Sequence, residues 1–251
     1  MSQTVARAID IVAFVSRRHR TLGEIADHLG VHKSTALRIL QTLEEGGFVR
    51  RVPDNRYAMG FQLIAYGQLA LDQVEARALA RPVLQELGER CGHTVHFAEL
   101  TGDRVVYVDK IDGRGSVAMG SRIGLPAILH TAAVAKAILA YQPDRSRWLS
   151  TCDFKRFTPT TITGRSELEA QLDIVRDRGW AEDDGEHEDF INCVALPVFD
   201  ARGQVTHSLS VTALKAVAPL AELRTHLDEY RTTAHRISRA LGWGGDDNGR
   251  R

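Results

Sequence analysis

Residues 21–43 carry the pattern of two short helices joined by a tight turn, and this pattern limits the fold of the N-terminal part more than any other feature. Thr21 and Glu24 stand three residues apart, the spacing of a capping box that opens a helix. Apolar residues then recur at helical spacing up to Gly30, where we expect a left-handed helix end. A second helical stripe follows, formed by Ala36, Ile39, Leu40 and Leu43.

The outward face of this second helix carries side chains suited to a DNA major groove. Hydroxyl and amide groups can reach base edges and phosphates, and an arginine can contact guanine through two hydrogen bonds. The residues predicted to face outward are Lys33, Ser34, Thr35, Arg38 and Gln41. Two short helices, a glycine-containing turn and a polar second helix are typical of a helix-turn-helix that reads double-stranded DNA.

A hairpin predicted directly after the second helix adds a wing. Residues 48–52 and 56–59 have strand character, and Pro53-Asp54-Asn55 between them favours a turn. Surface arginines on a hairpin are commonly only solvated, but the position after a helix-turn-helix favours contact with the phosphate backbone or an adjacent minor groove. The wing residues predicted to bind DNA are Arg50, Arg51 and Arg56.

The composition is that of a globular chain with its basic excess at the N-terminal end. The 251 residues are 43% hydrophobic and 25% charged, with net charge zero. Residues 1–60 hold nine Lys and Arg against six Asp and Glu, an excess of three positive charges. No apolar run of about 18 residues and no signal-peptide pattern occur, and the three cysteines form no CxxC. We therefore expect a cytoplasmic protein without a membrane span, a metal or a cofactor.

Periodicity divides the chain into four predicted parts. Residues 1–60 form the DNA-binding domain, and residues 61–76 form a linker helix that pairs with its copy in a second chain or, alternatively, packs only on its own domain. Residues 77–245 form the effector-binding and oligomerisation domain. Residues 246–251, rich in Gly, Asp and Arg, form a disordered tail.

The third part alternates strand and helix signals. A hairpin over residues 95–108 and a clear turn at 200–203 between two apolar runs predict an antiparallel sheet. The predicted strands are 95–100, 104–108, 116–123, 193–199 and 205–212, and the predicted helices are 131–141, 166–178 (capped by Ser166) and 219–241. Helices around one antiparallel sheet define an α+β domain.

Across nearly its whole length the sequence resembles the IclR family of bacterial transcriptional regulators. The matching motifs are LGEIADHLGVHKSTALRILQTL (22–43), the segment 57–60, GHTVHFAEL (92–100), VVYVDK (105–110), HTAAVAKAILA (130–140) and CVALPVFD (193–200). The resemblance implies an N-terminal winged helix-turn-helix joined by a linker helix to a GAF-like α+β effector domain. It also implies homodimers or dimers of dimers that respond to small organic, including aromatic, acids.

The resemblance further implies a polar ligand site on the sheet. Family members use an aspartate ten residues before a cysteine, that cysteine, and two hydroxyls from an S-x-S strand. Here these positions are Asp183, Cys193, Ser210 and Thr212, with Thr212 in place of the second serine. Asp184 is the alternative to Asp183 if the alignment slips by one residue.

The other implied ligand contacts lie before and on the helix at residues 131–141. Backbone N–H groups of Ala133 and Val134 are expected to face an anion, and Met119 aligns with an apolar wall position. Family members commonly have Gly-x-x-Gly-Lys where this chain has residues 132–136, and an arginine where it has Asn192. These departures favour a larger, less charged ligand, such as an aromatic acid or its neutral derivative.

Three other patterns have simpler interpretations than a catalytic or metal site. Cys193 as a nucleophile would make the chain a small-molecule hydrolase with an appended DNA-binding domain, but a cysteine at a strand start is more often a small buried residue. Cys91, His93 and His96 have no standard zinc spacing. The acidic run 183–189 is most simply a solvated loop, apart from Asp183.

Taken together, the sequence predicts a ligand-responsive transcription factor. Two copies would place their second helices in successive major grooves of a palindromic operator, and a small organic acid would bind the sheet domain. We expect a repressor of a catabolic operon; the hydrolase that uses Cys193 is the alternative.

Overall fold

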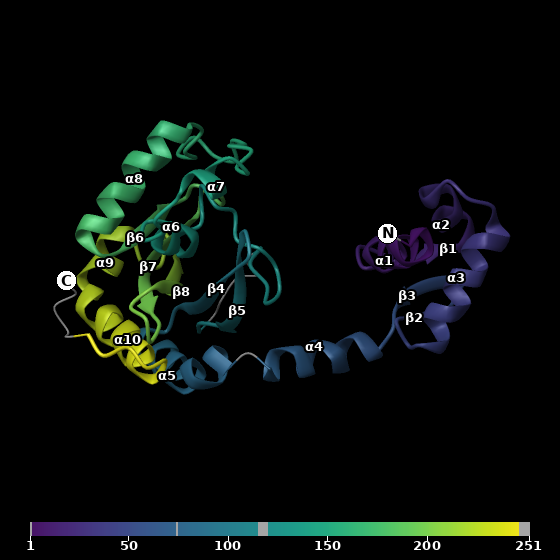
Figure 1. The fold of residues 1–251 in the computed structure, drawn as a ribbon, viewed down its shortest axis with the longest axis horizontal. Helices are drawn as coiled ribbons and strands as arrows, with labels where there is room; N and C mark the ends of the chain where they lie inside the picture. The colour runs from purple at the N-terminus through teal and green to yellow at the C-terminus, as the bar shows by residue number, and fades with distance from the viewer. Residues whose placement is uncertain (1, 74, 115–119, 246–251) are drawn as a thin grey trace. The chain divides into compact units, whose positions relative to one another are not determined.

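The computed structural model describes residues 2–73, 75–114 and 120–245, and the chain divides into two compact units between Gln73 and Val74 (Figure 1). Each unit has its own apolar core. The predicted ligand residue Met119 and the predicted tail 246–251 lie outside the described residues. Within the described ranges, no helix is long and apolar enough to cross a membrane.

The first unit contains the predicted helix-turn-helix and wing, with one helix before them and one after. Its helices are α1 (Gln3–Val15), α2 (Leu22–Leu29), α3 (Lys33–Glu45) and α4 (Gln62–Asp72). The strands β1 (Arg20–Thr21), β2 (Val49–Val52) and β3 (Arg56–Met59) pair in the order β1-β3-β2. The two-residue strand β1 was not predicted, because so short a segment has no periodicity.

The local signals in the helix-turn-helix act as the sequence predicts. Thr21 accepts a hydrogen bond from the backbone N–H of Glu24, and the Glu24 carboxylate accepts one from the N–H of Thr21 at 2.8 Å. Gly30 ends α2 with φ of +61°, a conformation that favours glycine. The apolar faces of α1, α2 and α3 then meet in one core, which includes Ile11, Ile25 and Leu40.

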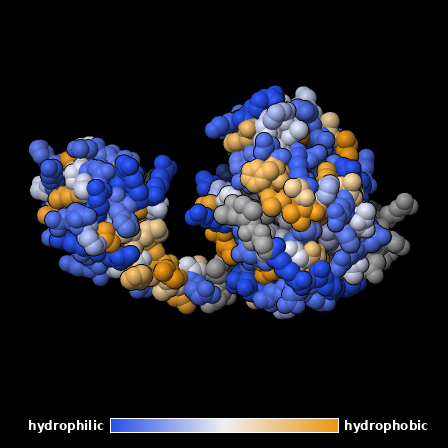
Figure 2. All heavy atoms as spheres, turned by 180° about the vertical axis from the view of Figure 1, so that it is seen from behind, coloured by the Kyte–Doolittle hydropathy of each residue, from blue (hydrophilic) through white to orange (hydrophobic). Residues whose placement is uncertain are grey.

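Helix α4 leaves apolar side chains at the surface. Phe61 just before it, and Ile64 and Leu69 within it, are 69%, 69% and 56% exposed. Figure 2 shows hydrophobic side chains, drawn in orange, along this segment. The chain continues into α5 from Glu75.

The second unit is built on a five-stranded antiparallel sheet with strand order β5-β4-β8-β7-β6. Its strands are β4 (Thr94–Thr101), β5 (Arg104–Ile111), β6 (Ala181–Asp184), β7 (Ile191–Phe199) and β8 (Val205–Leu214). One face packs against α6 (Ala133–Leu139), outside which lie α7 (Ser146–Leu149) and α8 (Arg165–Arg178). The other face packs against α5 (Glu75–Cys91), α9 (Leu220–Thr225) and α10 (Leu227–Ala240) (Figure 1).

A β-bulge interrupts the regular alternation of side chains along β5. Ala98 of β4 pairs with Tyr107, whereas Phe97 pairs with Asp109, so Val108 is the extra residue. Ala98 and Tyr107 belong to the core on the α6 side, and Phe97 and Val108 belong to the core on the α5 side. The bulge therefore lets Val108 and the next residue, Asp109, both face the α5 side, while Tyr107 faces α6.

Several predicted elements differ in detail from the structure. The predicted helix 219–241 is two helices that meet at His226, and the break lets Leu223 and Tyr230 both enter the core on the α5 side. The prediction that Ser166 caps a helix is wrong, because α8 starts one residue earlier with Gly164 at the N-cap.

The predicted strand 116–123 is not observed in its described part, since residues 120–123 form no strand. Strand β6 was missed, because Glu182, Asp183 and Asp184 give it no apolar alternation. It forms through its pairing with β7.

Candidate functional site

The outward face of α3 is polar and accessible, as the helical pattern predicts. Ala36 and Leu40 are fully buried, whereas the side chains predicted to face DNA lie on the other side. Of those, Lys33, Ser34, Arg38 and Gln41 are exposed and Thr35 is half-buried. Among the residues that the structure describes, Lys33 and Arg38 have no ion-pair partner. Their charges are therefore available to a phosphate or a base.

The three wing arginines lie on or beside the β2–β3 hairpin but are held by local contacts. Arg51 is exposed, while Arg50 and Arg56 are half-buried. Their partners are the Glu44 carboxylate for Arg51 (3.2 Å), the Glu24 carboxylate for Arg56 (3.6 Å) and the Phe61 ring for Arg50 (4.9 Å to the centroid). Each wing guanidinium therefore has a local partner, whereas Lys33 and Arg38 of α3 form no ion pair in the described part of the chain.

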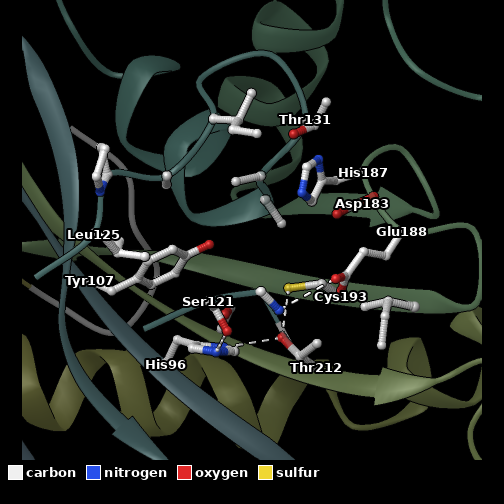
Figure 3. A pocket seen from close by; sticks show the side chains of 18 residues that line it. His96, Tyr107, Ser121, Leu125, Thr131, Asp183, His187, Glu188, Cys193 and Thr212 are labelled. Atoms are coloured by element: carbon white, nitrogen blue, oxygen red, sulfur yellow. Dashed lines mark hydrogen bonds between the residues drawn. The ribbon is translucent and has the colours of Figure 1, made fainter. Parts of the chain in front are cut away.

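A cavity of about 160 Å³ lies in the second unit on the α6 side of the sheet (Figure 3). Its floor is made by side chains of three adjacent strands, His96 on β4, Cys193 on β7, and Ser210 and Thr212 on β8. The register pairs Cys193 with Thr212 and His96 with Ser210, which brings the four residues together on one face. Tyr107, Asp183, the segment 125–133 and the β6–β7 loop complete the walls.

The structure brings most of the sequence-predicted ligand residues into this cavity. Asp183, Cys193, Ser210, Thr212 and Ala133 all line it.

Two other predicted positions do not line the cavity. Val134, whose backbone N–H was predicted to face an anion, is absent from the lining, and its side chain is buried in the core between α6 and the sheet. Asp184, the alternative to Asp183, is exposed and pairs with Lys215 at 2.8 Å. Alternation along β6 therefore selects Asp183 as the cavity residue.

A chain of hydrogen bonds links the polar groups on the floor. The Thr212 hydroxyl donates to the Cys193 sulfur at 3.2 Å, and its oxygen lies 3.3 Å from His96 Nδ1. Since a hydroxyl has one proton, His96 Nδ1 must be the donor to Thr212, and Nε2 then accepts from Ser121 Oγ at 2.8 Å. Burial lowers the pKa of His96 to about 3, which keeps the ring neutral at pH 7 and consistent with one donor and one acceptor nitrogen.

The Cys193 thiol is unsuited to nucleophilic chemistry. Burial raises its pKa to about 12, and the Thr212 hydrogen bond opposes this only in part. The thiol is therefore protonated at neutral pH, whereas a nucleophile needs the thiolate. As for metals, Cys91 lies on α5 and His96 in the cavity, and no group of three His, Cys, Asp or Glu in the described ranges is placed to hold an ion.

The acidic run 183–189 is partly buried, which corrects its interpretation as a solvated loop. Glu186 forms a buried ion pair with Lys136 of α6 at 2.6 Å, and its backbone N–H donates to Asp183 Oδ1 at 2.7 Å. Burial raises the pKa of Glu186 to about 7 against the opposing effect of Lys136. Burial also raises the pKa of Asp183, again opposed by Lys136. The pair ties the β6–β7 loop to α6 at the edge of the cavity.

Several cavity residues carried no usable sequence signal. His96 and Tyr107 lie in predicted strands, but their orientation depends on strand register and on the β5 bulge. The remaining polar lining residues that sequence reasoning missed are Ser121, Thr131, His187 and Glu188. Ser121 and Thr131 fell within a predicted strand and a predicted helix that do not include them in the structure, and His187 and Glu188 lie in a loop without periodicity.

Comparison with known proteins agrees with this division into a DNA-binding unit and a cavity-bearing unit. Residues 4–53 match the family model of the IclR helix-turn-helix domain, and residues 68–239 match that of the bacterial transcriptional regulator IclR C-terminal domain. The chain therefore belongs to the IclR family, and it is a ligand-responsive DNA-binding regulator.

The chain aligns with regulators over nearly the full length of both proteins. It is 31% identical over 246 residues to the HTH-type transcriptional regulator XynR of Escherichia coli K12, covering 96% of this chain and 98% of that protein. The crystal structure of the Thermotoga maritima IclR is 33% identical, with a TM-score of 0.82 and coverage of 97% and 100%. These relatives are regulators and not enzymes, which removes the hydrolase alternative for Cys193.

A third solved structure shares the fold at lower identity. It is an IclR homologue from Microbacterium hydrocarbonoxydans complexed with 4-hydroxybenzoate, 21% identical, with a TM-score of 0.80 and coverage of 95% of this chain and 99% of that chain. At this identity the comparison supports the fold alone.

The neutral, buried His96 predicts a loss of stability in acid. The unfolded chain takes up a proton near pH 6.5, whereas the folded chain does so only near pH 3, so stability is complete above pH 6.5 and falls as the pH decreases. Between pH 7 and pH 5 this residue should contribute about 1–2 kcal/mol of destabilisation. Glu186, whose pKa is raised to about 7 in the folded chain, has the opposite effect on the pH dependence of stability. Its contribution is the same in every variant compared, because none of them changes Glu186.

The measurement is the midpoint of thermal unfolding at pH 7 and pH 5 for the wild type and His96→Gln. The glutamine variant should lose less stability between the two pH values. Exposed His226→Gln on the other face of the sheet is the matched control and should behave as the wild type does. An unchanged acid-induced decrease in His96→Gln would contradict the assignment.

Proposed function

We propose that this regulator is a repressor of a catabolic operon, which binds a palindromic operator through α3 and releases it when a small organic compound fills the cavity. The observation that carries the proposal is the cavity at Asp183, Cys193, Ser210 and Thr212 in a chain whose other unit presents the uncompensated cations of α3. We assign DNA binding to residues 1–60, the link to 61–76 and effector binding to 77–245.

The DNA contacts divide by position on the first unit. Lys33, Ser34 and Thr35 in the first turn of α3, with Arg38 and Gln41 further along, take the groove-facing role. The wing residues Arg50, Arg51 and Arg56 take the phosphate-contacting role, because their contacts with Phe61, Glu44 and Glu24 hold them in place. In this assignment α3 contacts the bases, and the phosphate contacts of the wing set the register of the protein on the duplex.

Arg38→Ala should weaken binding to an operator duplex selected in vitro with the wild-type protein. If Arg38 contacts guanine, the loss is about 1–3 kcal/mol and specificity relaxes at one base pair. If it contacts a phosphate, affinity falls on all sequences alike and the salt dependence becomes less steep. Gel shifts on matched and mutated duplexes at two salt concentrations separate these cases.

The control for that experiment is Arg202→Ala, which removes the same charge from an exposed turn of the effector unit. Full operator affinity in Arg38→Ala would refute α3 as the reading helix.

The cavity suits a single-ring organic compound. An apolar cavity of about 150 Å³ holds a benzene molecule, which is close to the size of this one. Apolar walls come from Leu125, Ile128 and Ile191, and no Lys or Arg side chain is among the lining residues that the structure describes. Recognition must therefore use hydroxyls, backbone N–H groups and apolar contact. Ser210 and the amide of Ala133 are the donors we assign to an acid group, with Thr212, Met119 and Val134 as the other residues expected from the family pattern.

4-Hydroxybenzoate is the first probe, because a homologue of the same fold is complexed with it. Adding it should lower operator affinity by about 5–150-fold, and operator DNA should lower the affinity for the probe by the same factor. Fluorescence anisotropy on labelled operator and calorimetry on the probe measure the two factors. An increase in operator affinity would refute release as the mode of regulation.

We propose that α4 contributes to a homodimer, on which a dimer of dimers can build. Phe61, Ile64 and Leu69 expose an apolar stripe on a helix, and such surfaces are rarely left in water. A palindromic operator also requires two copies of α3 related by a two-fold axis.

Ile64→Glu should raise the dimer dissociation constant at least tenfold, because it places a charge at the centre of that stripe. Gln73→Glu, at an exposed position just after α4, adds the same charge and should leave the dimer intact. Sedimentation equilibrium at several concentrations compares the two variants. Equal molar masses for both variants would exclude α4 from the interface.

A further inference from the structure

We propose that Thr131 and His187 form a second polar pole of the cavity, so that the effector carries hydrogen-bonding groups at both ends of an apolar body. The inference rests on the proposed function, since it takes the cavity as the effector site. It assigns two further residues that determine specificity, and it requires a ligand with a hydrogen-bonding group at each end.

Thr131 carries a hydroxyl that the protein does not satisfy. The residue lies two positions before α6, lines the cavity and is only 1% exposed. Its Oγ1 is fully buried without a hydrogen-bond partner among the residues that the structure describes. A buried hydroxyl without a partner is costly, and native proteins keep such groups only for a reason. Its position in the cavity wall supplies one, because a ligand there can complete the bond.

His187 is a second group of the same kind. It lies on the β6–β7 loop and lines the cavity, and its Nδ1 is buried without a partner in the described part of the chain. The ring stands edge-on to Phe157 with 4.5 Å between centroids, which holds its orientation. A fixed imidazole with an unused nitrogen can donate to a ligand or accept from one, depending on its tautomer.

Two threonine hydroxyls beside the same loop do have hydrogen-bond partners, unlike the hydroxyl of Thr131. Thr161 Oγ1 donates to the carbonyl of Glu186 at 2.6 Å and accepts from the amide of Thr158 at 2.8 Å. Thr158 Oγ1 in turn donates to the carbonyl of Gly185 at 2.6 Å. Among the cavity-lining residues that the structure describes, Thr131 Oγ1 and His187 Nδ1 are the buried side-chain atoms without a partner; Glu186 Oε2, on the same loop, is also unpaired, but Glu186 does not line the cavity.

The two poles lie on different walls. Thr131 and His187 belong to the loops above the sheet, whereas His96 and Thr212 belong to the strands of the floor. Figure 3 shows the first pair on one side of the cavity and His96, Ser121 and Thr212 on the other. A ligand that spans the cavity therefore meets hydrogen-bonding groups at each end and apolar walls between them.

The first test compares one-ended and two-ended single-ring probes by calorimetry. 4-Hydroxybenzoate has two polar groups, and benzoate and phenol have one each. The wild type should bind 4-hydroxybenzoate at least tenfold more tightly than either one-ended probe. Thr131→Val and His187→Phe should each remove most of this advantage. In both variants, the one-ended probe that binds the residues of the floor should keep a Kd within about twofold of its wild-type value.

The second test needs no ligand and separates a ligand-binding role from a structural one. Thr131→Val removes an unpaired hydroxyl, so the free protein should keep or raise its Tm. Thr161→Val is the matched control, because it removes a buried hydroxyl that is fully bonded, and its Tm should fall by roughly 2–6 °C.

The outcomes distinguish this inference from the proposed function. Equal affinities for all three probes, or a Tm in Thr131→Val as low as that in Thr161→Val, would overturn the second pole and leave a single-ring effector in place. No binding of any probe would overturn the single-ring effector and the second pole together.

Discussion

The buried ion pair between Lys136 and Glu186 is the interaction that holds together the elements above the sheet around the cavity. Lys136 is on α6 and Glu186 on the β6–β7 loop, so one contact of 2.6 Å fixes both walls above the sheet. The amide of Glu186 also orients Asp183, and its carbonyl accepts from Thr161. Breaking a buried pair by removing one partner leaves an uncompensated charge and commonly costs about 3–5 kcal/mol. The pair is therefore better regarded as a device that sets the geometry of the cavity than as a source of net stability.

The same pair determines the electrostatics of the cavity. The ammonium group of Lys136 is consumed by Glu186, and neutral His96 adds no charge. The carboxyl groups of Asp183 and Glu188 line the cavity, and no Lys or Arg side chain is among the lining residues that the structure describes. The cavity therefore distinguishes ligands by shape and by the placement of hydrogen-bonding groups, and not by a Lys or Arg side chain that pairs with an anion. A buried polar group that a wrong ligand leaves unpaired penalises that ligand, which gives strong discrimination without ionic contacts.

What the sequence could predict depends on how local each determinant is. The Thr21–Glu24 capping box, the αL glycine at Gly30 and the turn at Pro53–Asn55 act within a few residues, and the structure has all three features. Strand β6 forms through its pairing with β7. The face to which His96 points depends on the pairing of β4 with β8, about a hundred residues away, and no local pattern encodes that register. Asp183, Cys193, Ser210 and Thr212 were found through family resemblance, whereas Thr131 and His187 sit in loops where their unpaired atoms appear only in three dimensions.

A ligand can shift a regulator between states only if it contacts the two states differently, so some element must connect the cavity to the rest of the effector unit. Strand β5 has contacts on both faces of the sheet. Tyr107 lines the cavity, whereas Asp109, just after the bulge, faces α5, where it pairs with Arg81 and lies 3.6 Å from Arg77. Asp109 is fully buried, so that pairing cannot be exchanged for water without cost. Helix α5 follows α4 along the chain. Strand β5 therefore contributes Tyr107 to the cavity wall and, through Asp109, is paired with the N-terminal half of α5, the first helix of the second unit.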